Sequence, residues 1–426
     1  MKRTLSLFLL LAVTWGSLAG CGSSNAVSAQ ELTAQPTSLS QQEMAVQGPN
    51  LPAVYAAVSD FGLSLLQEAR RETEADTLIS PLSVVLALSM AANGADGDTL
   101  EQFETVLAAG ADLAALNAAC QTLSERYENL GGSTECSIAN SLWIDPDGML
   151  REDFIGLCRG IFDAQVFSQE LSDPSVVPAV NGWVSDHTNK MIPAILSEPF
   201  SGNTAALLVN ALYLKNTWET EFDPNDTYLR GFYHQEDSKE SMDFLNAFST
   251  SFPYLQGKDA QGVVLPYDDG QLAFFALMPH LYPDSPEFGD WLDSLDGSSF
   301  AQLLESRTDT EFLTLALPKF EAEWSGQLQN TLSSMGLDLA FDNTGLADFS
   351  LLGDNPNGYY LSQVIHAAKI EVNEKGTEAA AATVVPAESG SAAPPESGIT
   401  LIFDRPFLYG IADLETGVPL FLGTFE

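Results

Sequence analysis

The order in which helical and strand patterns follow one another constrains the fold more than any other feature of this 426-residue sequence. Apolar residues recur at helical spacing over residues 51–71, and Ser80-Pro81 supplies a cap and a first-turn proline for a nearly all-apolar helix over residues 81–92. Patterns typical of strands are concentrated after residue 204. Helices gathered first and strands gathered later predict an α+β fold around antiparallel or mixed sheets.

The same patterns give expected positions for the remaining elements. We expect helices at residues 98–107, 112–127, 151–161 and 174–191, and shorter ones at 288–304 and 325–335. We expect strands at residues 205–214, 262–267, 272–278, 312–320, 359–372 and 399–425, the last interrupted by a turn at 415–417. Residues 386–398 are rich in Pro, Ser and Gly, which predicts an exposed loop.

The N-terminus has the pattern of an export signal. Lys2 and Arg3 precede an apolar run over residues 5–13, and the sequence Leu-Ala-Gly-Cys ends at Cys21. This ending resembles the bacterial lipoprotein box, which implies that residues 1–20 are removed and that Cys21 carries a lipid. An ordinary secretory signal with a chance cysteine is the alternative. We expect an exported protein, lipid-anchored at the bacterial cell surface or in the extracellular or periplasmic space.

Residues 21–50 differ in composition from the rest of the chain. They contain no aromatic and no basic residue, their only charges are Glu31 and Glu43, and Ser, Gln and Ala are abundant. Such a segment has too little apolar surface to order itself, so we predict a disordered tether followed by one domain over residues 51–426. No later segment reaches the roughly 20 apolar residues that span a bilayer, so the lipid would be the only membrane attachment.

The charge of the chain excludes several partners. Asp and Glu number 58 against 17 Lys and Arg, which gives a formal net charge of −41. This charge repels nucleic acid and anionic membrane surfaces, and the absence of basic clusters argues against a heparin-like activator. Cys120, Cys136 and Cys158 are too few for a disulfide framework, and we expect buried cysteines with at most one bridge.

The usual signatures of enzymes are missing. The four histidines belong to no H-E-x-x-H motif, and no G-x-S-x-G elbow, Walker loop or G-x-G-x-x-G occurs. The paired acids Asp145/Asp147 and Asp268-Asp269 lie beside glycine or proline, where we interpret them as turn residues. We therefore expect no catalytic residue, no metal and no cofactor, although a hydrolase with an irregular motif stays open as an alternative.

The stretch EVNEKGTEAAAATVV, residues 371–385, has conflicting local preferences. It begins and ends like a strand, but four consecutive alanines favour a helix and are depleted from strands. We interpret it as a segment that changes its partner; an alanine-rich loop or helix that does not move is the alternative. If the segment forms a strand, Thr377, Ala379, Ala381, Thr383 and Val385 share one face and their small side chains suit entry into a core.

Six blocks in a fixed order resemble the serpin family over nearly the whole domain. They are residues 77–83 (TLISPLS), 210–218 (NALYLKNTW), 317–320 (LPKF), 364–369 (VIHAAK), 371–383 (EVNEKGTEAAAAT) and 404–407 (DRPF). The resemblance implies the serpin fold, with three β-sheets, eight or nine helices and an exposed reactive-centre loop at about residues 374–398.

The resemblance also implies a function, that of a suicide-substrate inhibitor of serine proteases. A protease attacks the loop and forms an acyl-enzyme, and the hinge then inserts into the main sheet and traps the protease. The hinge residues are Glu374, Gly376, Thr377, Glu378, Ala379, Ala380, Ala381, Ala382 and Thr383. The family's shutter matches Ser80, Ser83, Asn210 and His366, and its breach matches Trp218. The implied partner is the target protease, bound covalently by a monomer.

The position of the reactive bond has two solutions, because the loop is longer than is usual in the family. Counting from the hinge gives Gly390-Ser391, whereas aligning the proline pair at residues 394–395 gives Ser391-Ala392. Both bonds follow a small residue, and residues 376–404 contain no Lys or Arg. We therefore expect elastase-like or subtilisin-like targets, with a glutamate-specific protease acting at Glu388 as a lesser option. Cysteine proteases as targets, or a non-inhibitory binding protein with the same fold, are the alternatives.

Overall fold

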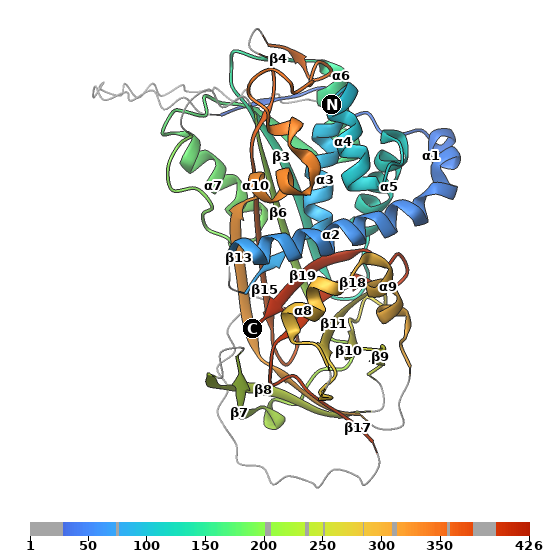
Figure 1. Cartoon of the computed structure of the whole chain (residues 1–426). Helices are drawn as coiled ribbons and strands as arrows, with labels where there is room; N and C mark the ends of the chain where they lie inside the picture. Colours follow the sequence, from blue (N-terminus) through green and yellow to red (C-terminus); the bar gives the residue numbers. More distant parts are fainter. Residues whose placement is uncertain are drawn as a thin grey trace, which may run out of the picture.

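The structure is a computed structural model in which a large central sheet runs the length of the molecule (Figure 1). It describes residues 29–73, 76–200, 206–234, 238–249, 252–283, 285–308, 313–355, 358–377 and 398–426. Because helices and strands pack as separate layers around three large sheets, the α+β prediction is confirmed.

The main sheet has seven strands and mixed parallel and antiparallel pairings. In order across the sheet they are β1 (Gln30–Leu32), β5 (Ala164–Ser168), β3 (Glu135–Ile144), β6 (Ala206–Thr217), β16 (Gly376–Thr377), β15 (Leu361–Val372) and β13 (Phe320–Gln327). Helix α7 (Val176–His187) covers one face, and helices α3 (Pro81–Ala92) and α5 (Leu113–Glu128) pack on the other face (Figure 1).

Two further sheets and one short ladder complete the β structure. The second sheet contains β2 (Leu78–Ile79), β19 (Pro419–Phe425), β18 (Phe407–Asp413), β11 (Leu272–Pro279), β10 (Ala260–Pro266) and β9 (Tyr254–Gln256). The third contains β17 (Ile399–Ile402), β12 (Leu313–Pro318), β8 (Lys239–Ser249) and β7 (Tyr228–Tyr233). The ladder pairs β14 (Gly353–Asp354) with β4 (Met149–Leu150).

The helices follow the predicted pattern closely. They are α1 (Gln41–Gln47), α2 (Leu51–Thr73), α3 (Pro81–Ala92), α4 (Gly97–Ala108), α5 (Leu113–Glu128), α6 (Glu152–Ile161), α7 (Val176–His187), α8 (Phe288–Ser294), α9 (Gly297–Glu305) and α10 (Gln329–Leu332). All residues of α3 are buried, and the Ser80 hydroxyl caps it by accepting a hydrogen bond from the Ser83 N–H. This helix packs against β3, β6 and β19 and so forms the centre of the core.

One expectation about the order of elements is wrong, and one predicted helix starts later than expected. Strands β3 and β5 lie in the helical half of the sequence, yet they form part of the main sheet. Their signal is weak because Ser137, Asn140 and Ser141 interrupt the apolar pattern of β3. The helix expected at residues 325–335 begins four residues later than predicted, because β13 continues to Gln327 as a strand; residues 329–337 are helical, as α10 and the π-helical turn that follows it.

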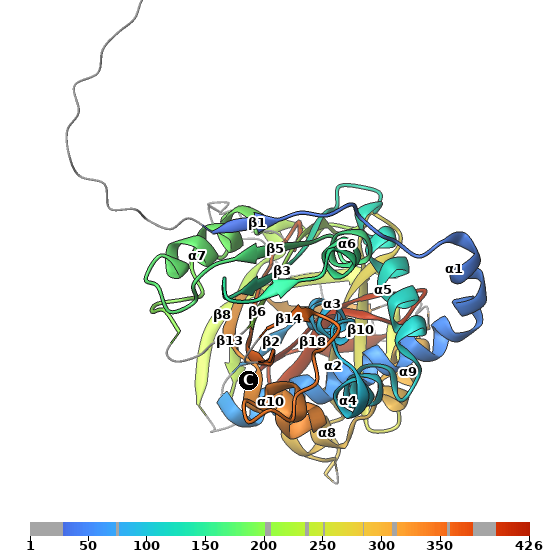
Figure 2. The same ribbon diagram turned by 90° about the horizontal axis from the view of Figure 1, so that it is seen from above.

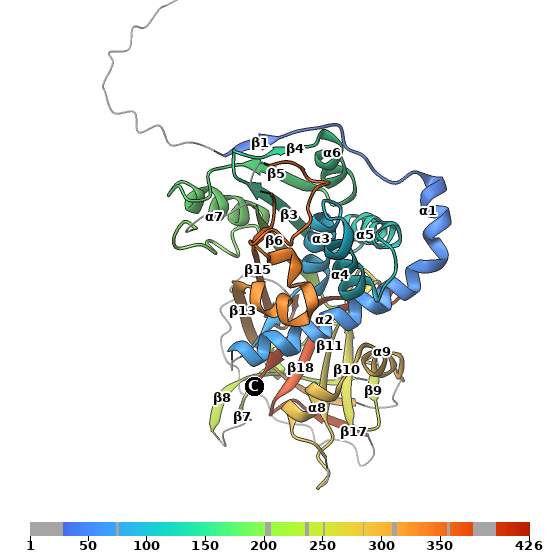
Figure 3. The ribbon, with the colours of Figure 1, turned by 45° about the horizontal axis from the view of Figure 1, so that its top comes forward.

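The predicted disorder of residues 21–50 is also wrong for residues 29–50, which form a strap along the outside of the molecule (Figures 2 and 3). Strand β1 pairs with β5 at the edge of the main sheet, and the chain then crosses α6 and ends in α1 beside α5. A capping box between Ser40 and Glu43 starts α1. We call residues 29–50 the N-terminal strap.

The N-terminal strap is held by hydrogen bonds to its polar and backbone groups, which a composition argument does not count, and by the partly buried Leu32, Ala34 and Leu39, which pack against the core. The Thr37 N–H donates to Gly156 O at 2.8 Å, the Ser38 hydroxyl donates to Gly160 O at 2.8 Å, and the Leu39 N–H donates to Gln121 Oε1 at 2.8 Å. Gly156 and Gly160 also leave room for the strap, because a β-carbon at either position would collide with its backbone.

Several expectations concern residues that the structure describes only in part. Cys120, Cys136 and Cys158 are free thiols, so none of them forms a bridge with another. Among the described residues no single helix has the length and hydropathy of a membrane span, and α4 with α5 would qualify only as a pair bent by 47°. Cys21 and the signal segment lie outside the described residues.

Candidate functional site

The seam between β6 and β15 contains most of the described residues that the sequence singled out. The two strands pair in parallel from Ala206 with Leu361 to Leu212 with Ala368. Beyond this point the two-residue strand β16 fits between them, with Gly376 opposite Thr217 and Thr377 opposite Asn216. The seam is therefore closed along most of its length and already holds the start of the hinge at the end nearest β8.

The first hinge residues are seated closely. Thr377 is 1% exposed, and its hydroxyl donates to the Tyr267 hydroxyl at 3.0 Å. Strand alternation assigned Thr377 to the core-facing side, whose other members lie outside the described residues. A β-carbon on Gly376 would collide with the backbone oxygen of Asn216, so only glycine permits the observed approach.

Trp218 closes the same end of the seam. Its Nε1–H donates to Asn373 O at 2.9 Å and its backbone N–H donates to Lys375 O at 2.8 Å. The indole ring stacks on Tyr267, with ring centroids 4.8 Å apart and planes inclined by 9°. The tryptophan thus fixes the backbone of the segment that leads into the hinge.

Glu374 is anchored by charge. Its carboxylate accepts hydrogen bonds from Lys319 Nζ at 2.9 and 3.2 Å and from the Thr227 hydroxyl at 2.9 Å. Burial alone would raise the pKa of Glu374, but the bonds from Lys319, Thr227 and the backbone outweigh it, so the pKa lies below its usual value. The carboxylate therefore stays ionised at neutral pH and holds the turn before Gly376.

The middle of the seam contains the four polar residues that the sequence grouped together. His366 lies opposite Asn210, and the Ser80 N–H donates to His366 Nε2 at 2.9 Å. Asn210 Nδ2 donates to Asn140 Oδ1 at 2.7 Å, and Ser83 adjoins Ser80 through the cap of α3. Asn140 was missed by sequence reasoning, because it is one of several polar residues that interrupt the apolar pattern of β3.

Comparison with known proteins decides the family. The family model described as Serpin (serine protease inhibitor) matches residues 56–426. This chain belongs to the serpin family. Among its relatives, Serpin-Z2A of Triticum aestivum is 32% identical over 372 residues, which cover 84% of this chain and 92% of the wheat protein.

Solved structures give the same fold. The thermophilic serpin tengpin in its native state matches with a TM-score of 0.80 and 29% identity, covering 93% of this chain and 99% of tengpin. The complex of thyroxine-binding globulin with thyroxine matches with a TM-score of 0.77 at 23% identity, covering 87% of this chain and 98% of that protein. This second likeness shows the fold alone.

His366 of this serpin is uncharged at neutral pH. Complete burial lowers the pKa of the imidazole to about 3. Because Nε2 accepts the Ser80 N–H, the neutral ring carries its proton on Nδ1. Among the described protein groups, His366 Nδ1, Asn210 Oδ1 and Ser83 Oγ have no protein hydrogen-bond partner. The middle of the seam is therefore weakly satisfied.

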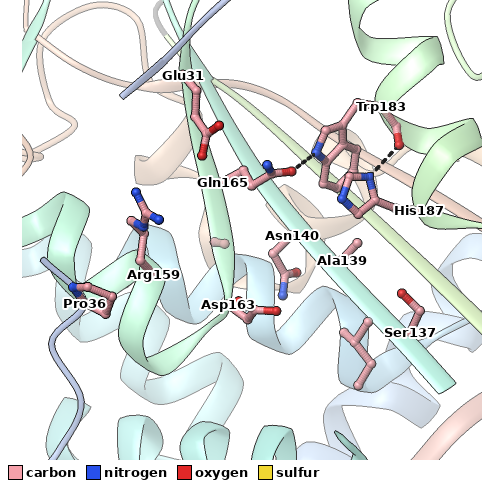
Figure 4. A pocket seen from close by; sticks show the side chains of 12 residues that line it. Glu31, Pro36, Ser137, Ala139, Asn140, Arg159, Asp163, Gln165, Trp183 and His187 are labelled. Atoms are coloured by element: carbon pink, nitrogen blue, oxygen red, sulfur yellow. Dashed lines mark hydrogen bonds between the residues drawn. The ribbon is translucent and has the colours of Figure 1, made fainter. Parts of the chain in front are cut away.

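A polar cavity of about 390 Å³ lies on the side of β3 away from the seam, where β3 extends past the start of β5 (Figure 4). Glu31 of the N-terminal strap and Arg159 of α6 line one side, and Trp183 and His187 of α7 stack on the other. Asn140 also lines it, so the cavity reaches a residue that is hydrogen-bonded to Asn210.

The described residues contain no recognisable catalytic arrangement at these sites. Among them, no group of three or more His, Cys, Asp or Glu side chains is placed to hold a metal. Asp145 and Asp269 accept hydrogen bonds from backbone N–H groups two residues on, which confirms both as turn residues. The remaining hinge residues 378–383 and the candidate reactive bonds Gly390-Ser391 and Ser391-Ala392 lie outside the described residues.

Proposed function

We propose that this serpin is an inhibitor that traps serine proteases by loop cleavage and hinge insertion. The observation that carries the proposal is the seat of Gly376 and Thr377, two residues deep between β6 and β15. The next residues in the sequence are Glu378 and four alanines, and the alanine side chains demand little room in the seam. The chain would therefore continue an insertion that its first two residues have begun.

Insertion must outrun deacylation for a protease to be trapped. After the protease attacks the loop, the part of the loop before the bond stays attached to the protease as an acyl group. Residues from Glu378 onward would then pair with β6 on one side and β15 on the other, which gives each inserted residue two new strand partners. Separation of the strands requires the weakly satisfied middle of the seam to open, at Asn210 and His366.

The composition of the loop supports a preference among proteases. With no Lys, Arg or aromatic residue between Gly376 and Phe403, small residues at Gly390 or Ser391 are the best candidates for the position before the reactive bond. We propose elastase-like or subtilisin-like enzymes as targets and a monomeric inhibitor. We also propose that lipid at Cys21 holds the protein at the surface of the cell that exports it.

Denaturing electrophoresis of the mature protein mixed with an elastase or a subtilisin tests the proposal. We expect a covalent complex with the wild type and clean cleavage without complex for Thr377→Arg, because a guanidinium cannot enter the 1%-exposed site of Thr377. Thr377→Ser is the matched control and should retain the complex. Mass spectrometry of the released peptide would identify the reactive bond.

A serpin-fold protein that binds a ligand without trapping proteases is the second candidate. Thyroxine-binding globulin, in complex with thyroxine, shares the fold of this chain. Absence of covalent complexes with a wide panel of serine and cysteine proteases would favour this candidate. Potent stoichiometric inhibition of trypsin would contradict the proposed specificity and leave the trapping mechanism intact.

A further inference from the structure

The turn between β10 and β11 brings two carboxylates to the end of the seam. Asp269 Oδ1 accepts hydrogen bonds from the N–H groups of Gln271 at 2.7 Å and Leu272 at 2.8 Å, which accounts for its place in the turn. The turn needs only this oxygen. The other carboxylate oxygen points away from the turn and toward β6.

Asp269 Oδ2 holds a residue that seats the hinge. It accepts hydrogen bonds from Asn216 Nδ2 at 2.6 Å and from the Thr134 hydroxyl at 2.9 Å. Asn216 is 2% exposed, and it is the β6 residue that lies opposite Thr377. Its backbone oxygen is also the atom that a side chain on Gly376 would strike. Asp269 thus fixes, through one side chain, the backbone that receives both inserted hinge residues.

Asp268 makes a useful contrast within the same turn. Its carboxylate accepts hydrogen bonds from the Ser133 N–H at 3.0 and 3.2 Å and bonds to no side chain of β6. Its backbone N–H donates to Thr217 O at 3.0 Å, a contact that any residue except proline can make. Only the Asp269 side chain bonds directly to a side chain of β6, whereas the Asp268 carboxylate reaches Thr217 only through Ser133, whose hydroxyl donates to Thr217 Oγ1 at 2.7 Å.

We propose that Asp269 is a positioning residue for hinge insertion, acting through Asn216. The inference rests on the proposed inhibitory function and names what sets its efficiency. With the end of β6 held in place, the first strand pair of the inserted hinge exists before cleavage, so the ordering of these residues does not slow the step that competes with deacylation. If Asn216 were mobile, the hinge residues would have to be ordered during insertion, and the insertion step would be slower.

A reciprocal exchange tests the contact directly. In Asp269→Asn the turn keeps its Oδ1, so the new amide nitrogen faces the Asn216 nitrogen; in Asn216→Asp two carboxylates face each other. The double variant again pairs one donor with one acceptor. The Thr217 N–H, which donates to Asn216 Oδ1 in the wild type, still finds a carboxylate oxygen at position 216. Loss of a hydrogen bond to a charged group corresponds to roughly a tenfold or larger change in the rate of hinge insertion. For each single variant we therefore expect several times more inhibitor molecules to be cleaved for every protease molecule that is trapped. The double variant should recover.

Two measurements separate this inference from the proposed function. The first is the amount of inhibitor consumed per elastase molecule trapped, with Asp268→Asn as the control that removes an adjacent charge and should behave as wild type. The second needs no trapping: after the loop is cut by a protease that is not retained, insertion is followed through the fluorescence of Trp218, which stacks on Tyr267.

The outcomes are decisive in each case. Slower insertion in both single variants with recovery in the double variant supports the assignment, even when the wild type traps no protease and the inhibitory function itself fails. Unchanged insertion rates in Asp269→Asn, or failure of the double variant to recover while it remains folded by thermal melting, would overturn it. A cut wild-type protein that never inserts would contradict both proposals.

Discussion

The two ends of one seam are built differently. At the hinge end, Trp218, Thr377 and Glu374 all find hydrogen-bond partners, and the backbone is packed too closely for a side chain on Gly376. In the middle, the polar side chains of His366 and Asn210 are equally buried, yet each leaves one polar atom without a protein partner among the described residues.

The strands of the seam should therefore separate less readily at the hinge end than in the middle. The satisfied end can keep its geometry while a strand is added, so it serves as a template. The weakly satisfied middle has fewer hydrogen bonds between protein groups to lose when its strands separate. Because the hinge end is held in place and the strands in the middle separate more easily, insertion should begin at the hinge end and proceed toward His366.

The largest effect on protease trapping should come from a substitution that blocks the site between β6 and β15 where Gly376 lies. Gly376→Val places a β-carbon against the Asn216 backbone oxygen, which has no flexible end that could move aside. We expect complete loss of covalent protease complexes, with the loop cleaved as an ordinary substrate, as measured on denaturing gels. Gly182→Val, at a glycine of α7 with no neighbouring atom within 4 Å of its added β-carbon, should still form complexes. Complexes with Gly376→Val would show that the hinge end is not a template.

A smaller effect should follow from weakening the middle further. His366→Ala leaves the Ser80 N–H without its acceptor and opens a cavity, which destabilises the closed sheet by about 2–4 kcal/mol. We expect spontaneous conversion to an inserted, inactive form on warming to be roughly tenfold faster or more, as measured by native gels and residual activity. His280→Ala, which removes a buried histidine outside the seam, is the control; equal conversion in both variants would refute the special position of His366.

Lowering the pH should destabilise the middle of the seam, at His366, and leave the hinge end, at Glu374, unchanged. The pKa of His366 falls from 6.5 in an exposed ring to about 3 when the ring is buried. The closed sheet therefore has its full stability above pH 6.5, where His366 is neutral in both states, and loses stability as the pH falls toward 3. Glu374 has a pKa below its usual 4.5 and stays ionised at pH 5. We expect conversion at pH 5 to be several times faster than at pH 8, and His366→Gln to remove most of that dependence. A pH profile unchanged in His366→Gln would sink this assignment.

The smallest effect should come from a contact outside the seam. Gly160→Leu would displace the strap backbone at Thr37 and weaken the attachment of β1 to β5. We expect a fall in melting temperature of about 1–4 °C and unchanged trapping of proteases, since neither end of the seam is touched. Gly182→Leu is the matched helical control. Loss of trapping in Gly160→Leu would show that the outer edge of the sheet takes part in insertion.

Local signals in the sequence account for the elements that were predicted well. The bounds of α3 match the structure because Ser80, Pro81 and a continuous apolar run mark both its start and its face. Strand β3 was missed because Asn140 looks unfavourable until its partner Asn210 is known, and the N-terminal strap was missed because it is held by backbone bonds. The shutter residues came from the family resemblance, whereas the role of Asp269 depends on where a distant turn meets β6.

The two outer edges of the main sheet are protected from association in different ways. An unpaired edge strand offers N–H and C=O groups to any neighbouring chain and is a site of aggregation. On one side, β13 carries the charged residues Glu321 and Glu323 along its edge. On the other side, the sheet ends in β1, which covers β5 from Val166 to Ser168 and offers an edge of only three residues. An inhibitor concentrated on a membrane by lipid, as proposed, would meet its own copies constantly, and the N-terminal strap would keep those encounters from becoming sheets shared between molecules.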